Sequence, residues 1–128
     1  MDRLTELHLT LLIYCSDEWC DLGALAAVVG RALPTADRQA VRSRTLELLG
    51  DLLHAGLIEA GQPTRAREWV PWGLSAAETL EHLRREWEGV DADRRRLPVG
   101  AIAWFTATPK GVQAIHVELD KVPPGNGR

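Results

Sequence analysis

Residues 37–61 (DRQAVRSRTLELLGDLLHAGLIEAG) constrain the fold more than any other stretch, because a long amphipathic helix there continues directly into a strand. Apolar residues in the first part recur at helical spacing, which predicts one face turned toward a core. Gly56 stands at the expected helix end, where glycine reaches a positive φ without a Cβ clash. Residues 57–60 then predict a short strand. The predicted inward face consists of Val41, Thr45, Leu48, Leu49 and Leu52.

Two shorter helices are predicted before this stretch. Leucines at helical spacing indicate a first helix over residues 2–14. Residues 19–21 predict a short strand, and residues 22–32 a second helix whose alanines allow close packing. Residues 33–36 (LPTA) form the turn, so the second and third helices predict a helix-turn-helix.

The chain after the strand is not expected to turn back within a few residues. Residues 62–100 instead predict an insertion that carries a helix over residues 75–88, opened by the capping-box sequence SAAE. The alternation in residues 101–107 (AIAWFTA) predicts the returning strand. A threonine and a proline then start a last helix, which runs to about Asp120. Its predicted inward residues are Val112, Ile115 and Leu119.

Composition predicts one domain over residues 1–120 and a flexible tail over residues 121–128. The apolar fraction of 45% is enough for a packed core without disulfides or metal. No apolar run approaches the roughly 20 residues that cross a bilayer, and no leader sequence is evident. We therefore expect a soluble, cytoplasmic protein that makes no membrane contact.

Catalytic and metal-binding patterns are absent from the sequence. It contains no G-x-S-x-G motif, no phosphate-binding glycine loop and no Cys–His pair at reactive spacing. The acidic pairs at residues 17–18 and 91–93 are expected to be solvated loop charges. Cys15 and Cys20 are expected to be small buried hydrophobes, although their spacing also permits a disulfide. We expect no enzyme activity, no cofactor and no metal.

Two separated segments resemble parts of one known fold. Residues 48–58 (LLGDLLHAGLI) are similar to the end of the recognition helix and the first wing strand of winged-helix domains. Residues 104–111 (WFTATPKG) resemble the second wing strand and the L-T-x-x-G helix start of MarR-like and PadR-like winged-helix proteins. The resemblance covers about residues 1–61 and 101–119.

This resemblance implies an α+β, mostly helical fold: a winged helix-turn-helix with a small antiparallel β-sheet. Residues 57–61 would pair antiparallel with residues 101–107, and the insertion with its one helix would bulge out between the two wing strands. That insertion departs from the family pattern, because the wing of DNA-binding members usually lies along the phosphate backbone.

The first function that we expect is that of a non-catalytic transcriptional regulator bound to double-stranded DNA. The start of the third helix would enter the major groove, while basic residues near the wing and the last helix would contact phosphates. A competing interpretation is that the arginines are a solvated helix end paired with Asp37, Glu47 and Asp51. The candidate DNA-binding residues are Arg38, Gln39, Arg42, Ser43, Arg44, Arg65, Arg67 and Lys110.

The alternative function is that of a protein-binding winged-helix module, such as a toxin-neutralising immunity protein or an anti-regulator. The insertion carries Trp69, Trp72 and Trp87, which offer large rigid contact surfaces. The same tryptophans could instead dock the inserted helix on the domain, an interpretation that suits Trp87 best. Either function is compatible with a homodimer formed through the first and last helices.

Overall fold

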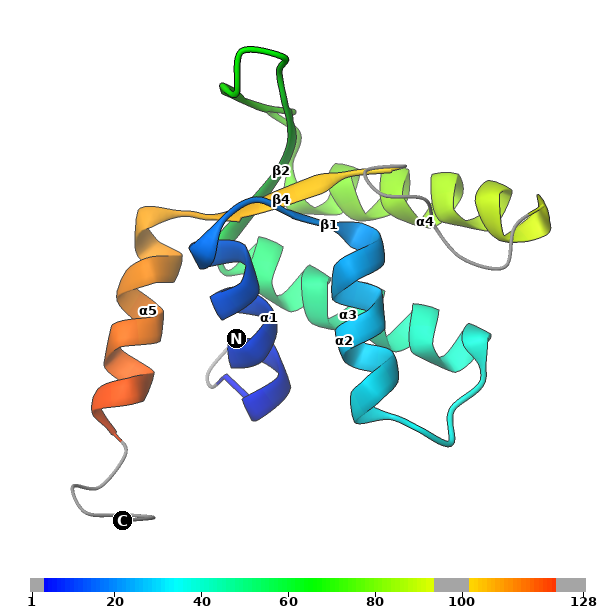
Figure 1. Ribbon diagram of the computed structural model, residues 1–128, viewed down its shortest axis with the longest axis horizontal. Coiled ribbons are helices and arrows are strands. Elements are labelled where there is room, and N and C mark those ends of the chain that lie inside the picture. The colour runs from blue at the N-terminus through cyan, green and yellow to red at the C-terminus, as the bar shows by residue number, and fades with distance from the viewer. Residues whose placement is uncertain (1–3, 94–101, 122–128) are drawn as a thin grey trace.

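The structure is a computed structural model that describes residues 4–93 and 102–121, with residues 90–93 as backbone only. These residues form five helices and four strands (Figure 1). The predicted α+β, mostly helical class with a small antiparallel sheet is confirmed. The elements are α1 (Glu6–Asp17), β1 (Cys20–Asp21), α2 (Leu22–Ala32), α3 (Arg38–His54), β2 (Ile58–Pro63), β3 (Trp69–Pro71), α4 (Ala76–Asp93), β4 (Trp104–Ala107) and α5 (Pro109–Asp120).

Helix α3 begins and ends as its sequence predicts. The Asp37 side chain accepts a hydrogen bond from the Ala40 amide at 2.8 Å, which satisfies a free donor of the first turn. At the other end, Gly56 has a φ of 73°, and the Leu57 amide donates back to the Leu52 carbonyl at 3.0 Å. This left-handed cap reverses the chain and starts β2 directly after the helix.

The sheet has the strand order β1-β4-β2-β3. Strands β2 and β4 are antiparallel neighbours with Ile58 opposite Ala107 and Gly61 opposite Trp104, so the predicted pairing is confirmed. The expectation that the chain does not turn back after β2 is wrong. Residues 64–68 form a tight turn, and β3 returns along β2 as an edge strand. Pro71 is tolerated in β3 because an edge strand has one side without ladder bonds.

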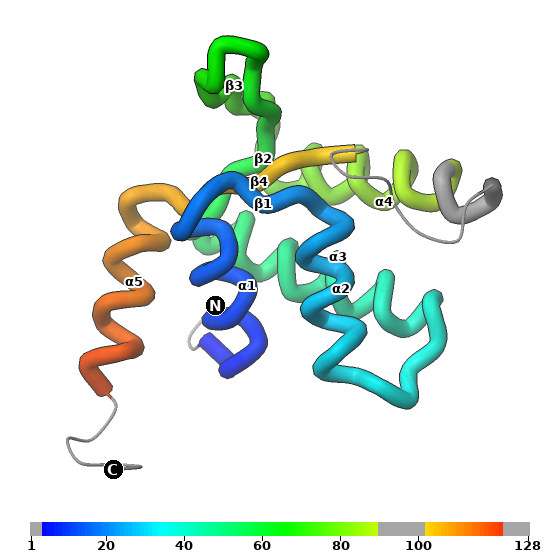
Figure 2. Tube along the Cα trace, in the orientation of Figure 1, coloured from blue at the N-terminus to red at the C-terminus, as the bar shows by residue number. Residues whose placement is uncertain are grey.

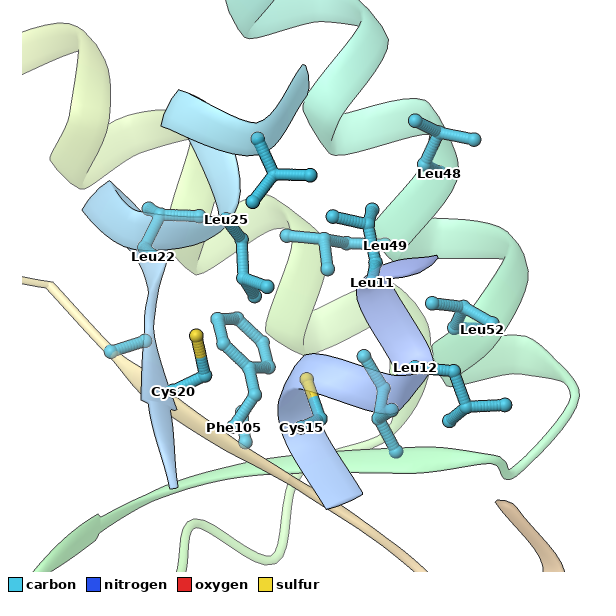
Figure 3. Packing of buried hydrophobic residues seen from close by; sticks show 14 of the residues in the cluster. Leu11, Leu12, Cys15, Cys20, Leu22, Leu25, Leu48, Leu49, Leu52 and Phe105 are labelled. Atoms are coloured by element: carbon cyan, nitrogen blue, oxygen red, sulfur yellow. The ribbon is translucent and has the colours of Figure 1, made fainter. Parts of the chain in front are cut away.

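The core lies between the sheet and the helices α1, α2 and α3. Figure 3 shows Phe105 of β4 pointing into this layer beside Cys15, Cys20 and the leucines of all three helices. Phe105 is fully buried, and both cysteines are free and buried, as expected for small hydrophobes. Inward residues of β4 and β2 thus alternate with residues that face away from the helices.

Several predicted boundaries need correction. The first helix begins at Glu6 and runs to Asp17, the returning strand begins at Trp104, and α4 runs to Asp93. Asp17 and the acidic pair at residues 91–93 therefore lie in helices and not in loops. Of the three inward residues predicted for α5, only Ile115 is buried, since Val112 is 39% and Leu119 52% exposed. The buried residues of α5 are Gly111 and Ile115, and Ala114 packs against the core beside them. Residues 1–3, 94–101 and 122–128 lie outside the described part of the chain, and so do nearly all of the predicted flexible tail and the predicted first residues of the first helix and of the returning strand.

Helix α4 packs across the second half of α3. A Cβ added to Gly50 would lie 3.0 Å from the Leu80 side chain, which shows how closely the two helices approach. Leu83 and Trp87 of α4 are buried in the common core. The inserted helix is therefore part of the domain core, and the first half of α3 diverges from it (Figure 1).

Candidate interaction surfaces

The first half of α3 carries the predicted base-reading residues. Arg38, Gln39 and Ser43 are exposed, and the Arg42 guanidinium donates to Oε1 of the Gln39 side chain at 2.6 Å. Arg44 forms an ion pair with Glu47 one turn further along. Pairs of this kind on a solvated helix contribute only about 0.5 kcal/mol, so a ligand can displace them at little cost. The surface is available but not strongly basic, because Asp37, Glu47 and Asp51 match its three arginines in number.

Arg65 and Arg67 lie in the exposed turn between β2 and β3. Arg67 holds a positive φ of 62°, and its amide donates to the Thr64 carbonyl at 3.0 Å, so the turn is locally fixed. Figures 1 and 2 show this hairpin projecting from the sheet away from α2 and the α2–α3 turn. The two groups of arginines are therefore not brought together on one face.

Lys110 closes the end of α3. Its Nζ donates to the Ala55 carbonyl at 2.9 Å, and the neighbouring Thr108 hydroxyl donates to the Gly56 carbonyl at 2.7 Å. A cation at this place also suits the negative end of the helix dipole. Any phosphate contact by Lys110 would have to break this bond.

The three tryptophans of the insertion do not form one surface. Trp87 is 5% exposed and belongs to the core, as the docking interpretation predicts. Trp72 is half-buried and meets the edge of the His82 ring, with ring centroids 4.8 Å apart. Trp69 lies on β3. Unlike Trp72 and Trp87, it is on the side of the sheet that faces away from the helices.

A different aromatic cluster forms on that outer side of the sheet. The Trp69 ring lies 5.7 Å from the ring of Trp19, and its Nε1 donates to the Glu59 carboxylate at 2.7 Å. Trp104, opposite Gly61, lies on the same side because its neighbour Phe105 points inward. Sequence reasoning missed this cluster. Its one local signal was that these residues alternate with buried ones along their strands.

Sequence reasoning also missed a chain of polar contacts between α1 and α3. Thr5 Oγ1 lies 2.6 Å from His8 Nδ1, and His8 Nε2 lies 2.8 Å from Asp51 Oδ2. A hydroxyl, an imidazole and a carboxylate in this order also form the catalytic triad of many hydrolases. Here, however, Nδ1 accepts from the Thr5 amide and Oγ1 accepts from the His8 amide, so both groups form the helix cap. The contact ties the start of α1 to α3.

Burial determines the state of the two thiols. Desolvation, with a smaller contribution from the neighbouring Asp21 carboxylate, raises the pKa of Cys20 to about 11. The deeper Cys15 has its pKa raised further, again mainly by desolvation. Both groups are therefore protonated and poorly nucleophilic near neutral pH.

Other site types find little support in residues 4–93 and 102–121. No group of three or more potential ligands there could hold a metal ion, and no helix within these ranges has the length and apolarity to cross a bilayer. A cavity of about 280 Å³ opens between Leu53 of α3, Ile58 of β2 and the start of α4. It is slightly smaller than typical sites for drug-sized ligands, roughly 300–1,000 Å³, and we assign no ligand to it.

Comparison with known proteins found no match: no protein-family model, no curated protein and no solved structure resembles the chain significantly.

Proposed function

We propose that the chain is a non-catalytic winged-helix regulator that binds double-stranded DNA through the first half of α3. The winged-helix assignment is supported by the element order and by the antiparallel pairing of β2 with β4 after a helix-turn-helix. In that fold the third helix reads the major groove with its first turns. The observation that carries the proposal is the start of α3, where Arg38, Gln39 and Ser43 are exposed and the helix diverges from α4.

The proposed interface is smaller than the one expected from the sequence. Arg38, Arg42 and Arg44 supply charge, while Gln39 and Ser43 can reach base edges. Lys110 is omitted because it caps α3, and the hairpin arginines are omitted because the hairpin projects to the other side. A chain with a net charge of −3 and so few basic contacts should bind random DNA weakly, and its salt dependence should be shallow because the slope grows with the number of phosphates contacted.

A salt titration tests this proposal. Fluorescence anisotropy of a random 20-base-pair duplex would be measured from low to physiological salt for the wild type and for Arg42→Ala. We expect Arg42→Ala to weaken binding and to reduce the salt slope by about one, because one phosphate contact releases about one counterion. The matched control is Arg65→Ala, which removes the same charge at the hairpin and should leave the slope unchanged.

Two results would contradict the proposal. The first is an absence of duplex binding at the lowest salt. The second is a slope that falls for Arg65→Ala and not for Arg42→Ala, which would move the contact from α3 to the hairpin.

A homodimer is a further part of the proposal, supported by apolar side chains that α1 and α5 leave exposed. Ile13 is 39% exposed on α1, and Leu119 is 52% exposed on α5. A dimer of this kind would present two copies of α3 to two half-sites. Sedimentation equilibrium of the wild type and of Leu119→Ser would test it.

A second candidate function is binding of a protein partner, and one observation favours it. Trp69 and Trp19 form a half-buried aromatic pair on the side of the sheet that the helices do not cover. This surface differs from the three-tryptophan interface expected from the sequence, because Trp87 is in the core.

A further inference from the structure

The outer aromatic cluster joins the two edges of the sheet. Strands β1 and β3 are the edge strands, with β4 and β2 between them. Trp19 immediately precedes β1 and Trp69 begins β3, yet their ring centroids are only 5.7 Å apart and the rings are tilted by 33°. Two long side chains therefore reach toward each other over the central strands, which the twist of a small sheet permits.

Gly61 makes room for this arrangement. A Cβ at position 61 would lie 2.8 Å from Trp69 Cζ2 and 2.4 Å from the Val70 carbonyl oxygen. Because glycine has no side chain, the Trp69 ring can lie directly on β2. The indole N–H then reaches Glu59, two residues away on the same side of the strand.

Glu59 is the charged group of the cluster. Glu59 is half-buried, and its carboxylate accepts one bond from a neutral indole, which does not compensate its negative charge. A carboxylate can accept about four hydrogen bonds, so most of its capacity remains. Across the described ranges, no basic side chain forms an ion pair with Glu59.

These features select one kind of ligand. An aliphatic side chain laid on the indoles would desolvate Glu59 without a partner, and a phosphate would be repelled by it. A guanidinium group is planar, stacks on indole faces and donates charge-assisted bonds to a carboxylate. The exposed charges beside the two tryptophans in sequence, Glu18 and Glu68, have the same sign as Glu59.

We propose that the face formed by Trp19, Trp69 and Glu59 docks an arginine-bearing segment of a partner protein. The guanidinium stacks on the indole pair and donates to the free positions of the Glu59 carboxylate. This site is spatially separate from the proposed DNA contact, because α3 lies on the other side of the sheet (Figure 1). Both surfaces can therefore be occupied together, and each can fail without the other.

The test uses ¹H–¹⁵N spectra of the full chain, in which each tryptophan gives a separate indole signal. The probes are the peptide Ac-GSRSG-NH₂ and its citrulline analogue, which has nearly the same shape but no charge. The Trp69 signal, assigned with Trp69→Phe, should shift saturably with the arginine peptide and hardly at all with the citrulline peptide. Glu59→Gln keeps the acceptor for the indole N–H and should weaken binding about threefold or more.

The matched control is Glu47→Gln, which removes an exposed carboxylate from α3 and should bind the arginine peptide as the wild type does. Equal shifts with both peptides, unchanged affinity in Glu59→Gln, or no shift of the Trp19 and Trp69 signals would each overturn the proposal. Shifts of these signals caused by the duplex instead of the peptide would show a nucleic-acid surface and would also overturn it.

Discussion

Replacing Gly111 by alanine should destabilise the protein, although the same replacement usually stabilises a helix. Gly111 lies in the first turn of α5, where its amide donates to the Thr108 hydroxyl at 3.0 Å. A Cβ there would lie 2.0 Å from the Leu57 carbonyl oxygen and 3.2 Å from Leu12 Cδ1. The oxygen belongs to the backbone at the start of β2, so it cannot rotate away as a side chain could.

The size of the effect follows from two opposing contributions. Alanine in a helix is favoured over glycine by about 0.8–1 kcal/mol. Overpacking against a fixed backbone costs about 1–3 kcal/mol or more, and it forces α5 away from the end of α3. That displacement also strains the bond from the Thr108 amide to the Leu57 carbonyl, which is 2.9 Å long. Because a contact of 2.0 Å with a backbone oxygen places the overpacking cost at the upper end of its range, we expect a net loss of about 2 kcal/mol in the free energy of unfolding.

Gly89 provides the matched control, because it lies in α4 with nothing within 4 Å of an added Cβ. Gly89→Ala should raise the free energy of unfolding by up to about 1 kcal/mol. Urea unfolding followed by circular dichroism would measure both variants. If Gly111→Ala were as stable as the wild type, or more so, the close contact between α5 and β2 would be refuted.

Two further predictions concern buried polar groups. Since the folded pKa of Cys20, about 11, is above the unfolded value of about 8.5, its contribution to stability should be complete below pH 8 and lost as the pH rises toward 11. Urea midpoints from pH 8 to 11 should therefore fall more steeply for the wild type than for Cys20→Ala; equal slopes would contradict this. Replacing His8 by alanine should cost about 2–4 kcal/mol, because the change removes a buried ring, a cap and the bond to Asp51. Asp51→Asn keeps an acceptor and should cost less than His8→Ala in the same urea assay, and the opposite order would contradict the assigned roles.

Local signals predicted most of the fold because they act over a few residues. Gly56 predicts the end of α3 without any knowledge of tertiary contacts, because a left-handed helix cap depends mainly on a glycine at that position. The second helix has the predicted bounds, Leu22–Ala32. Strand β3 was missed because Pro63 and Pro71 flank a charged turn, which favours a loop over a strand. Its formation depends on pairing with β2, and a local pattern does not show this.

The candidate surfaces were harder to predict because they depend on tertiary contacts. Lys110 looked like a phosphate ligand, and only the geometry shows that it reaches the Ala55 carbonyl across 55 positions of sequence. Trp19 and Trp69 are separated by half the domain in sequence, and nothing near either one indicates its partner. The residue types therefore suggested the chemistry, but the fold determines which groups meet.

The insertion between β2 and β4 connects the two proposed surfaces physically. Its first half brings Trp69 onto the outer side of the sheet, and its second half places Leu80 against Gly50 of α3. Between them, the Trp72 amide donates to the Ala60 carbonyl at 3.0 Å, which fixes the connecting segment to β2. A ligand that moved β3 would therefore act on the helix that supports α3. One continuous segment between β2 and β4 therefore positions both proposed surfaces.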